Sequence, residues 1–83
     1  MSYTLDVDIL AEQQIAALSP LALTALAETV TVLEVVSWNG LPLNDVKPDG
    51  AVRQLPFGDI GMITYLILDD QRRVDLLIVT WAG

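Results

Sequence analysis

The carboxy-terminal stretch, GMITYLILDDQRRVDLLIVTWAG over residues 61–83, constrains the fold more than any other part of the chain. Two apolar segments, 62–68 and 74–81, flank the short charged sequence DDQR, which is typical of a loop between antiparallel strands. Both segments are rich in the β-branched and aromatic residues that favour strands. The sequence therefore predicts a β-hairpin, against which the preceding elements must pack.

Both faces of this predicted hairpin are apolar. In its first strand Met62 and Leu66 alternate with Ile63 and Tyr65, so neither side is polar. A two-layer fold covers only one face of a sheet with helices. The second face is therefore covered by loops or meets another chain, and the sequence leaves both alternatives open.

The order of periodic segments predicts one α+β domain over residues 1–83. Its helical hairpin is expected to pack on a mainly antiparallel four-stranded sheet. Ser19 and Pro20 mark the start of the second helix, with serine as N-cap and proline at the first helical position. The predicted elements are a strand at 3–7, helices at 9–18 and 20–36, a loop at 39–50, and strands at 51–57, 62–68 and 74–81.

The composition excludes several kinds of chemistry. The 83 residues are 53% hydrophobic and include no cysteine and no histidine, so thiolate nucleophiles, disulfides and histidine bases are absent. Eleven acidic residues against four basic ones give a net charge of −7, which repels nucleic acid. The start MSYTLDVD lacks the features of a signal peptide, and no apolar run approaches the roughly 20 residues that span a bilayer. We expect a cytoplasmic protein without membrane contact.

No segment predicts a metal site or a cofactor site. The sequence DVKPDG at 45–50 resembles the start of a calcium loop, but Lys47 occupies the third ligand position and Pro56 stands where the glutamate belongs. Gly58 and Gly61 lack the lysine and the following helix of a phosphate loop. We therefore expect no bound metal and no cofactor.

Five side chains are candidates for binding or catalysis: Arg53, Tyr65, Arg72, Arg73 and Trp81. Arg53 lies inside a predicted strand, either as a snorkelling arginine paired with an acid or as a phosphate or carboxylate contact on the open sheet face. Tyr65 belongs to the core or stacks at the surface, and Trp81 closes the core or anchors an interface. The paired arginines at the hairpin turn serve solvation or binding.

Several segments together resemble the RelE/ParE superfamily of bacterial toxins: YTLDVDILAEQQIAALSP, NGLPL, GAVRQLPFG and the carboxy-terminal stretch. In that superfamily a strand leads into a helical hairpin, a strand with R-x-L, a strand ending in Y-x-(I/V)-x-D-(D/E), and a final strand. Arg53 matches the first motif, and Tyr65 with Asp69 and Asp70 matches the second. The resemblance covers nearly the whole chain and is nearest to small actinobacterial RelE-like members.

The resemblance implies a toxin of a type II toxin–antitoxin module. RelE-like members cleave mRNA on the ribosome and ParE-like members poison gyrase, so both targets are implied, together with a cognate antitoxin as partner. RelE-like nucleases place lysines and arginines on the sheet to stabilise the phosphate during attack by the 2′-hydroxyl. By this resemblance Arg53 and Tyr65 are the candidate catalytic residues.

The chain departs from the nuclease pattern at several positions. Met62 stands where many members have an arginine, and LPFGD replaces the lysines of the middle strand. The arginine and tyrosine that follow the last strand in RelE-like members have no counterpart before Gly83. Losing one preorganised charge donor costs about 10²–10³ in rate. We therefore expect an mRNA-cleaving activity that is attenuated or lacking, and whether the chain is an enzyme stays open.

Two functions follow from the sequence. The first is a RelE/ParE-like toxin-family protein that engages its partner around Arg53, Tyr65 and Trp81. The alternative is a noncatalytic protein-interaction or dimerisation domain on the same scaffold, with a second copy as partner. An acidic mimic of nucleic acid is disfavoured because the acids are scattered along the chain.

Overall fold

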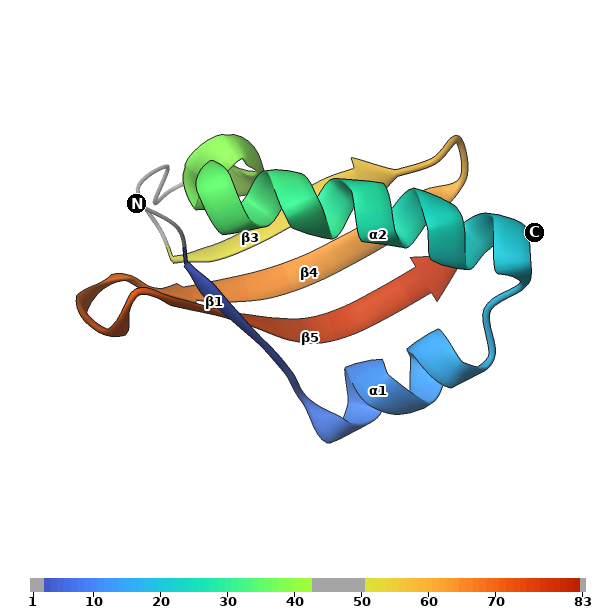
Figure 1. Cartoon of the computed structure of the whole chain (residues 1–83), viewed down its shortest axis with the longest axis horizontal. Helices are drawn as coiled ribbons and strands as arrows, with labels where there is room; N and C mark the ends of the chain where they lie inside the picture. The colour runs from blue at the N-terminus through green and yellow to red at the C-terminus, as the bar shows by residue number, and fades with distance from the viewer. Residues whose placement is uncertain (1–2, 43–50, 83) are drawn as a thin grey trace.

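The computed structural model describes residues 3–42 and 51–82, in which two helices lie on one face of a five-stranded sheet (Figure 1). Short 3₁₀ helices η1 and η2 follow α2 and β4. The elements are β1 Thr4–Val7, α1 Ile9–Ala16, α2 Pro20–Val35, η1 Ser37–Asn39, β2 Leu41–Pro42, β3 Val52–Phe57, β4 Gly61–Leu68, η2 Asp69–Gln71 and β5 Arg73–Trp81.

The sheet has the strand order β1-β5-β4-β3-β2. β1 pairs with β5 in parallel, and the other three pairs are antiparallel. The predicted α+β fold, a helical hairpin on a mainly antiparallel sheet, is confirmed. The carboxy-terminal hairpin forms its centre, because β4 and β5 each have a strand on both sides.

The fifth strand, β2, was not predicted. It comprises Leu41 and Pro42 inside the segment expected to be a loop, and it pairs with Arg53 and Gln54 of β3. Two residues are too few to show an alternating pattern, and a proline is tolerated at the edge of a sheet. The rest of that predicted loop, residues 43–50, lies outside the described residues, as does the calcium-like sequence at 45–50.

Local signals explain where α1 ends and where α2 begins. The Ser19 hydroxyl accepts a hydrogen bond from the Ala22 amide at 3.3 Å, so α2 begins at Pro20 as expected. α1 ends at Ala16, two residues before its predicted end. The amides of Ala17 and Leu18 donate to carbonyls three residues back, which tightens the last turn and ends the helix before Ser19.

The core lies between the helices and one face of the sheet. Arg53, Leu55 and Phe57 of β3 share this face, and their β4 partners extend it. The Leu33 side chain of α2 is fully buried against it. Its buried apolar members are Tyr3, Ala11, Leu26, Leu33, Phe57, Ile63, Tyr65, Ile67, Val74, Leu76 and Val79.

The opposite face of β3, β4 and β5 is covered by neither helix and is here called the open face. Along these strands the side chains that alternate with the core point to it. Met62 and Ile78 remain 37% and 39% exposed there, whereas Thr64, which pairs with Ile78, is 8% exposed. In the described residues the second apolar face predicted for the hairpin is therefore partly open.

We expect Leu33→Ala to lower the free energy of unfolding by about 2–5 kcal/mol, because a fully buried leucine is replaced by a cavity. Urea unfolding followed by circular dichroism measures the change. Val35→Ala on the outer side of the same helix, where Val35 is 66% exposed, is the matched control and should cost less than about 0.5 kcal/mol. Equal losses for the two variants would contradict the assigned core.

Candidate functional site

Two of the candidate residues, Arg53 and Tyr65, meet beneath η1 on the helix-covered side of the sheet. The Tyr65 hydroxyl donates to the Ser37 carbonyl at 2.8 Å and accepts from the Gly40 amide at 2.9 Å. Arg53 Nη1 donates to the Gly40 carbonyl at 2.8 Å, and its guanidinium lies 4.7 Å from the centroid of the Trp38 ring. These contacts attach the segment after α2 to the two strands below it.

The Arg53 and Tyr65 side chains are buried, although Trp38 above Arg53 is 41% exposed. Tyr65 is 0% exposed and Arg53 is 9% exposed. Burial raises the pKa of the Tyr65 hydroxyl, although the hydrogen bond from Gly40 and the charge of Arg53 oppose the shift. A Cβ at position 40 would collide with this hydroxyl and lie 2.8 Å from the Gln54 carbonyl oxygen, so glycine allows the close approach. Tyr65 is a core residue rather than a surface stacking residue.

A second polar network connects η2 to Tyr3, the residue before β1, and to η1. One Asp69 carboxylate oxygen accepts hydrogen bonds from the Tyr3 hydroxyl and, at 3.4 Å, from Trp38 Nε1. The bond from Tyr3 is the main cause that lowers the pKa of Asp69, followed by the bond from Trp38. Arg72 has a left-handed backbone with φ of 51°, and its guanidinium lies 5.6 Å from the centroid of the Tyr3 ring.

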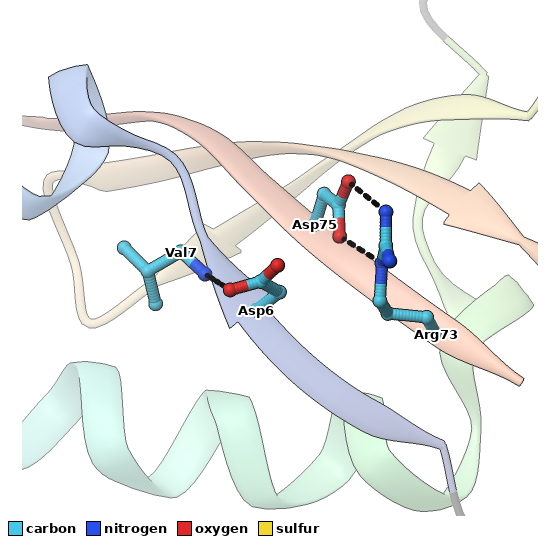
Figure 2. A network of polar contacts seen from close by, with 4 residues as sticks. All are labelled: Asp6, Val7, Arg73 and Asp75. Atoms are coloured by element: carbon cyan, nitrogen blue, oxygen red, sulfur yellow. Dashed lines mark hydrogen bonds and ion pairs between the residues drawn. The ribbon is translucent and has the colours of Figure 1, made fainter.

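Arg73 lies at the start of β5 and forms an ion pair with Asp75 (Figure 2). Its Nε donates to Asp75 Oδ1 at 2.8 Å and its Nη2 donates to Asp75 Oδ2 at 3.3 Å. The hydrogen bond to Asp75 is the main cause that raises the pKa of Arg73, and the negative charge of Asp6 on β1 adds to it. Two carboxylates therefore offset this cation.

The centre of the open face is neutral in the described residues. Register places Thr64 between Gln54 and Ile78, and Met62 between Pro56 and Thr80. Gln54 Nε2 donates to Thr64 Oγ1 at 3.4 Å. Amide, hydroxyl, thioether and aliphatic groups make up this centre, so it presents hydrogen-bonding and apolar contacts but no formal charge.

Trp81 ends β5, where it both completes the core and borders two surface hollows. Its ring packs on Phe57 with centroids 5.3 Å apart and planes tilted by 34°. It also forms part of the wall of each hollow, one toward the α1–α2 connection and one toward the β3–β4 turn. The two roles that the sequence left open, closing the core and anchoring an interface, are both compatible with this position.

The five candidate residues do not form one site. Arg53 and Tyr65 lie in the buried cluster, Arg72 lies at the hairpin turn, and Arg73 lies on the opposite face of the sheet. Trp81 is eight strand residues from Arg73, or about 26 Å at the usual rise per residue. Within residues 3–42 and 51–82, no group of acidic side chains is placed to hold a metal ion.

Comparison with solved structures assigns the fold. A chain of the toxin–antitoxin complex RelBE2 from Mycobacterium tuberculosis matches with a TM-score of 0.83 and 23% identity over 98% of this chain and 99% of that one. The isolated E. coli RelE toxin matches with a TM-score of 0.80 and 19% identity over 99% of this chain and 86% of that one. The chain has a RelE-like fold.

A more distant match has the same architecture. The archaeal RelE–RelB complex from Pyrococcus horikoshii matches with a TM-score of 0.66 and 12% identity, over 100% of this chain and 98% of that one. No family model matches the chain, and no curated protein matches it. None of the described helices is long and apolar enough to cross a membrane.

Sequence reasoning identified Arg53 and Tyr65 but missed what they contact. Gly40 and Ser37 precede Tyr65 by 25 and 28 residues, and they lie in a segment expected to be irregular. The only signal was the Asn39-Gly40 pair, which indicated a turn and gave no hint of a buried hydrogen bond. The pairing of Arg73 with Asp75 depends on strand alternation and was not anticipated.

We expect Tyr65→Phe to destabilise the fold by about 1–3 kcal/mol, because the Ser37 carbonyl and the Gly40 amide lose a buried partner while the ring packing is kept. Chemical denaturation of the purified variant measures the change. If the variant unfolds at the wild-type denaturant concentration, the hydroxyl does not secure η1.

The Tyr3–Asp69 hydrogen bond should make stability depend on pH. Because folding lowers the pKa of Asp69 below its ordinary value of 3.8, this stabilisation is complete above that pH and is lost as pH falls through the folded-state pKa. The difference in unfolding free energy between wild type and Tyr3→Phe should therefore narrow on acidification below about pH 4.

Unfolding curves at a series of pH values between 2 and 7 measure this difference. Tyr65→Phe is the matched control, since the pKa of Tyr65 is raised and its hydroxyl does not titrate in this range. A constant Tyr3→Phe penalty across the range would show that Asp69 is not the partner.

Proposed function

We propose that this chain is the toxin-family protein of a bacterial toxin–antitoxin module, with weak or absent mRNA-cleaving activity, and that it acts by binding protein partners. The RelE-like fold supports the first part, since solved structures with this fold include RelE toxins and complexes of RelE with RelB. A cognate antitoxin is the proposed partner.

The observation that carries the proposed weak or absent mRNA cleavage is the lack of available positive charge on the described part of the open face. Cleavage of a phosphodiester by a neighbouring hydroxyl without a metal requires cations that stabilise the developing phosphate charge. Arg73 is the described basic side chain on this face, and it is committed to Asp75 beside Asp6. Met62, Thr64 and Gln54 at the centre supply no cation.

The burial of Arg53 and Tyr65 also supports weak or absent mRNA cleavage. Arg53 and Tyr65 match the family motifs, yet their described partners are Ser37, Gly40 and Trp38. A phosphate would have to displace the contacts with Ser37 and Gly40 to reach the Tyr65 hydroxyl. The missing charge donors would each account for about 10²–10³ in rate, and the net charge of −7 opposes approach to RNA.

The alternative, a noncatalytic dimerisation domain, is favoured by Met62 of β4 and Ile78 of β5, two apolar side chains that lie diagonally across the strand pair and are exposed on the open face. Apolar surface of this kind suits contact with another copy of the chain. Light scattering of the purified chain at micromolar concentration separates the two proposals. A stable dimer that Met62→Ser with Ile78→Ser dissociates would favour the alternative, and a monomer that binds the antitoxin would favour the module.

We expect the purified chain to leave mRNA intact in a reconstituted translation reaction in which the E. coli RelE toxin cleaves it. Primer extension on the ribosome-bound message detects the cuts. In the same series, the chain should form a stable complex with the polypeptide encoded by the adjacent gene, as judged by co-purification. Cleavage at rates similar to those of the E. coli toxin would overturn the proposed loss of activity.

A further inference from the structure

A continuous flank of α2 next to β3 carries exposed apolar side chains that neither the fold nor the open face uses. Leu21 is 76% exposed and Val32 is 42% exposed, although both belong to the most apolar helix of the chain. Ile60 in the β3–β4 turn is 46% exposed and lies across a hollow from Leu21. Exposed apolar surface bordered by polar residues is typical of interaction sites.

Two neighbouring hollows lie along this flank. The first has a volume of about 330 Å³ and the second about 280 Å³. Leu21, Ala25, Gly58, Asp59, Ile60 and Trp81 line the first, and Glu28, Thr29, Val32, Leu55 and Pro56 line the second. We call the two together the α2 groove.

The α2 groove is acidic as well as apolar. Asp59 and Glu28 line it, one in each hollow, and none of the described arginines does. Those arginines are engaged elsewhere: Arg53 with Gly40 and Trp38, Arg72 over Tyr3, and Arg73 with Asp75. Among residues 3–42 and 51–82, no basic side chain supplies the charge that complements this groove, so the groove suits a cationic partner.

We infer that the α2 groove binds a basic amphipathic helix of the antitoxin partner, with apolar side chains seated in the two hollows and cations beside Glu28 and Asp59. This inference rests on the proposed toxin–antitoxin function and names the surface that it uses. From Leu21 to Val32 the groove follows α2 for 11 residues, or about 17 Å, which matches about three turns of a bound helix.

Other occupants fit the groove less well. A second copy of this chain carries the same net charge of −7, and its described arginines already have partners. An anionic membrane surface is repelled by Glu28 and Asp59. An added β-strand would find no backbone donor at Pro56, which lies on β3 within the groove. A cationic helix satisfies both the charge and the shape.

The test uses the full-length chain and the polypeptide encoded by the adjacent gene, with binding measured by calorimetry. Leu21→Ser combined with Ile60→Ser should raise Kd at least about tenfold, because two apolar anchors are lost. Ile9→Ser is the matched control, since Ile9 is 71% exposed on α1 and lies outside the groove. The substituted positions are exposed, and circular dichroism confirms that each variant folds.

A second pair of variants tests the charge. Glu28→Lys with Asp59→Lys should raise Kd about tenfold at low salt, and the difference should shrink at roughly 0.5 M salt as charges are screened. Glu12→Lys with Asp70→Lys makes the same change in net charge outside the groove and should have a smaller effect. Equal effects of the two charge pairs would show attraction to the whole molecule, not to this groove.

The outcomes separate this inference from the proposed function. If the groove variants bind the partner with an unchanged Kd, the inferred binding site in the α2 groove is wrong, and the proposed antitoxin partner stands. Absence of any complex would overturn both. If the chain alone forms a dimer that Leu21→Ser with Ile60→Ser dissociates, the occupant is a second copy and the inference of a basic partner helix is wrong.

Discussion

The pairing of β4 with β5 is the interaction on which the rest of the structure depends. These two strands lie at the centre of the sheet, so β1 is ordered against β5 and β3 against β4. Their register shifts between Thr64 and Tyr65, which leaves Leu77 as an extra residue between the partners Ile78 and Leu76. The core side of the pair receives α2, and Tyr65 on that side also receives η1. The strand order and the hydrogen bonds that hold η1 therefore both depend on this one hairpin.

Positive charge is scarce in this chain, and the described part of it is used for structure. Arg53 joins a 3₁₀ segment to the sheet, and Arg73 is held by Asp75 with Asp6 nearby. In an acidic protein the pairing of Arg73 is the expected result, because carboxylates outnumber cations. A surface that binds phosphate requires the opposite, cations gathered in excess of anions. The distribution of charge thus favours protein partners, and the acidic α2 groove is the place where a basic one would be accommodated.

Much of this architecture could be predicted from the sequence, because its long elements are periodic. The helical hairpin and the three carboxy-terminal strands were found from apolar spacing, with ends correct to within about two residues. β2 was missed because Leu41 and Pro42 are too few to form a pattern. The candidate residues were found, but not their arrangement: the partners of Tyr65 lie 25 and 28 residues before it, and sequence spacing contains no information on such contacts. Which side of the sheet Arg53 occupies depended on packing that only the folded chain reveals.

The burial of Arg53 and Tyr65 bears on what a match to the sequence motif can reveal about function. In this chain the two residues that match the family motifs hold the segment after α2 against the sheet and take no part in the open face. In this chain the match to the motif therefore reflects the fold. Sorting RelE-like chains by activity would require a different criterion, the excess of cations over carboxylates among the outward-facing positions of β3, β4 and β5. By that criterion the described outward-facing positions of this chain show no excess of cations, because Arg73 is paired with Asp75 beside Asp6.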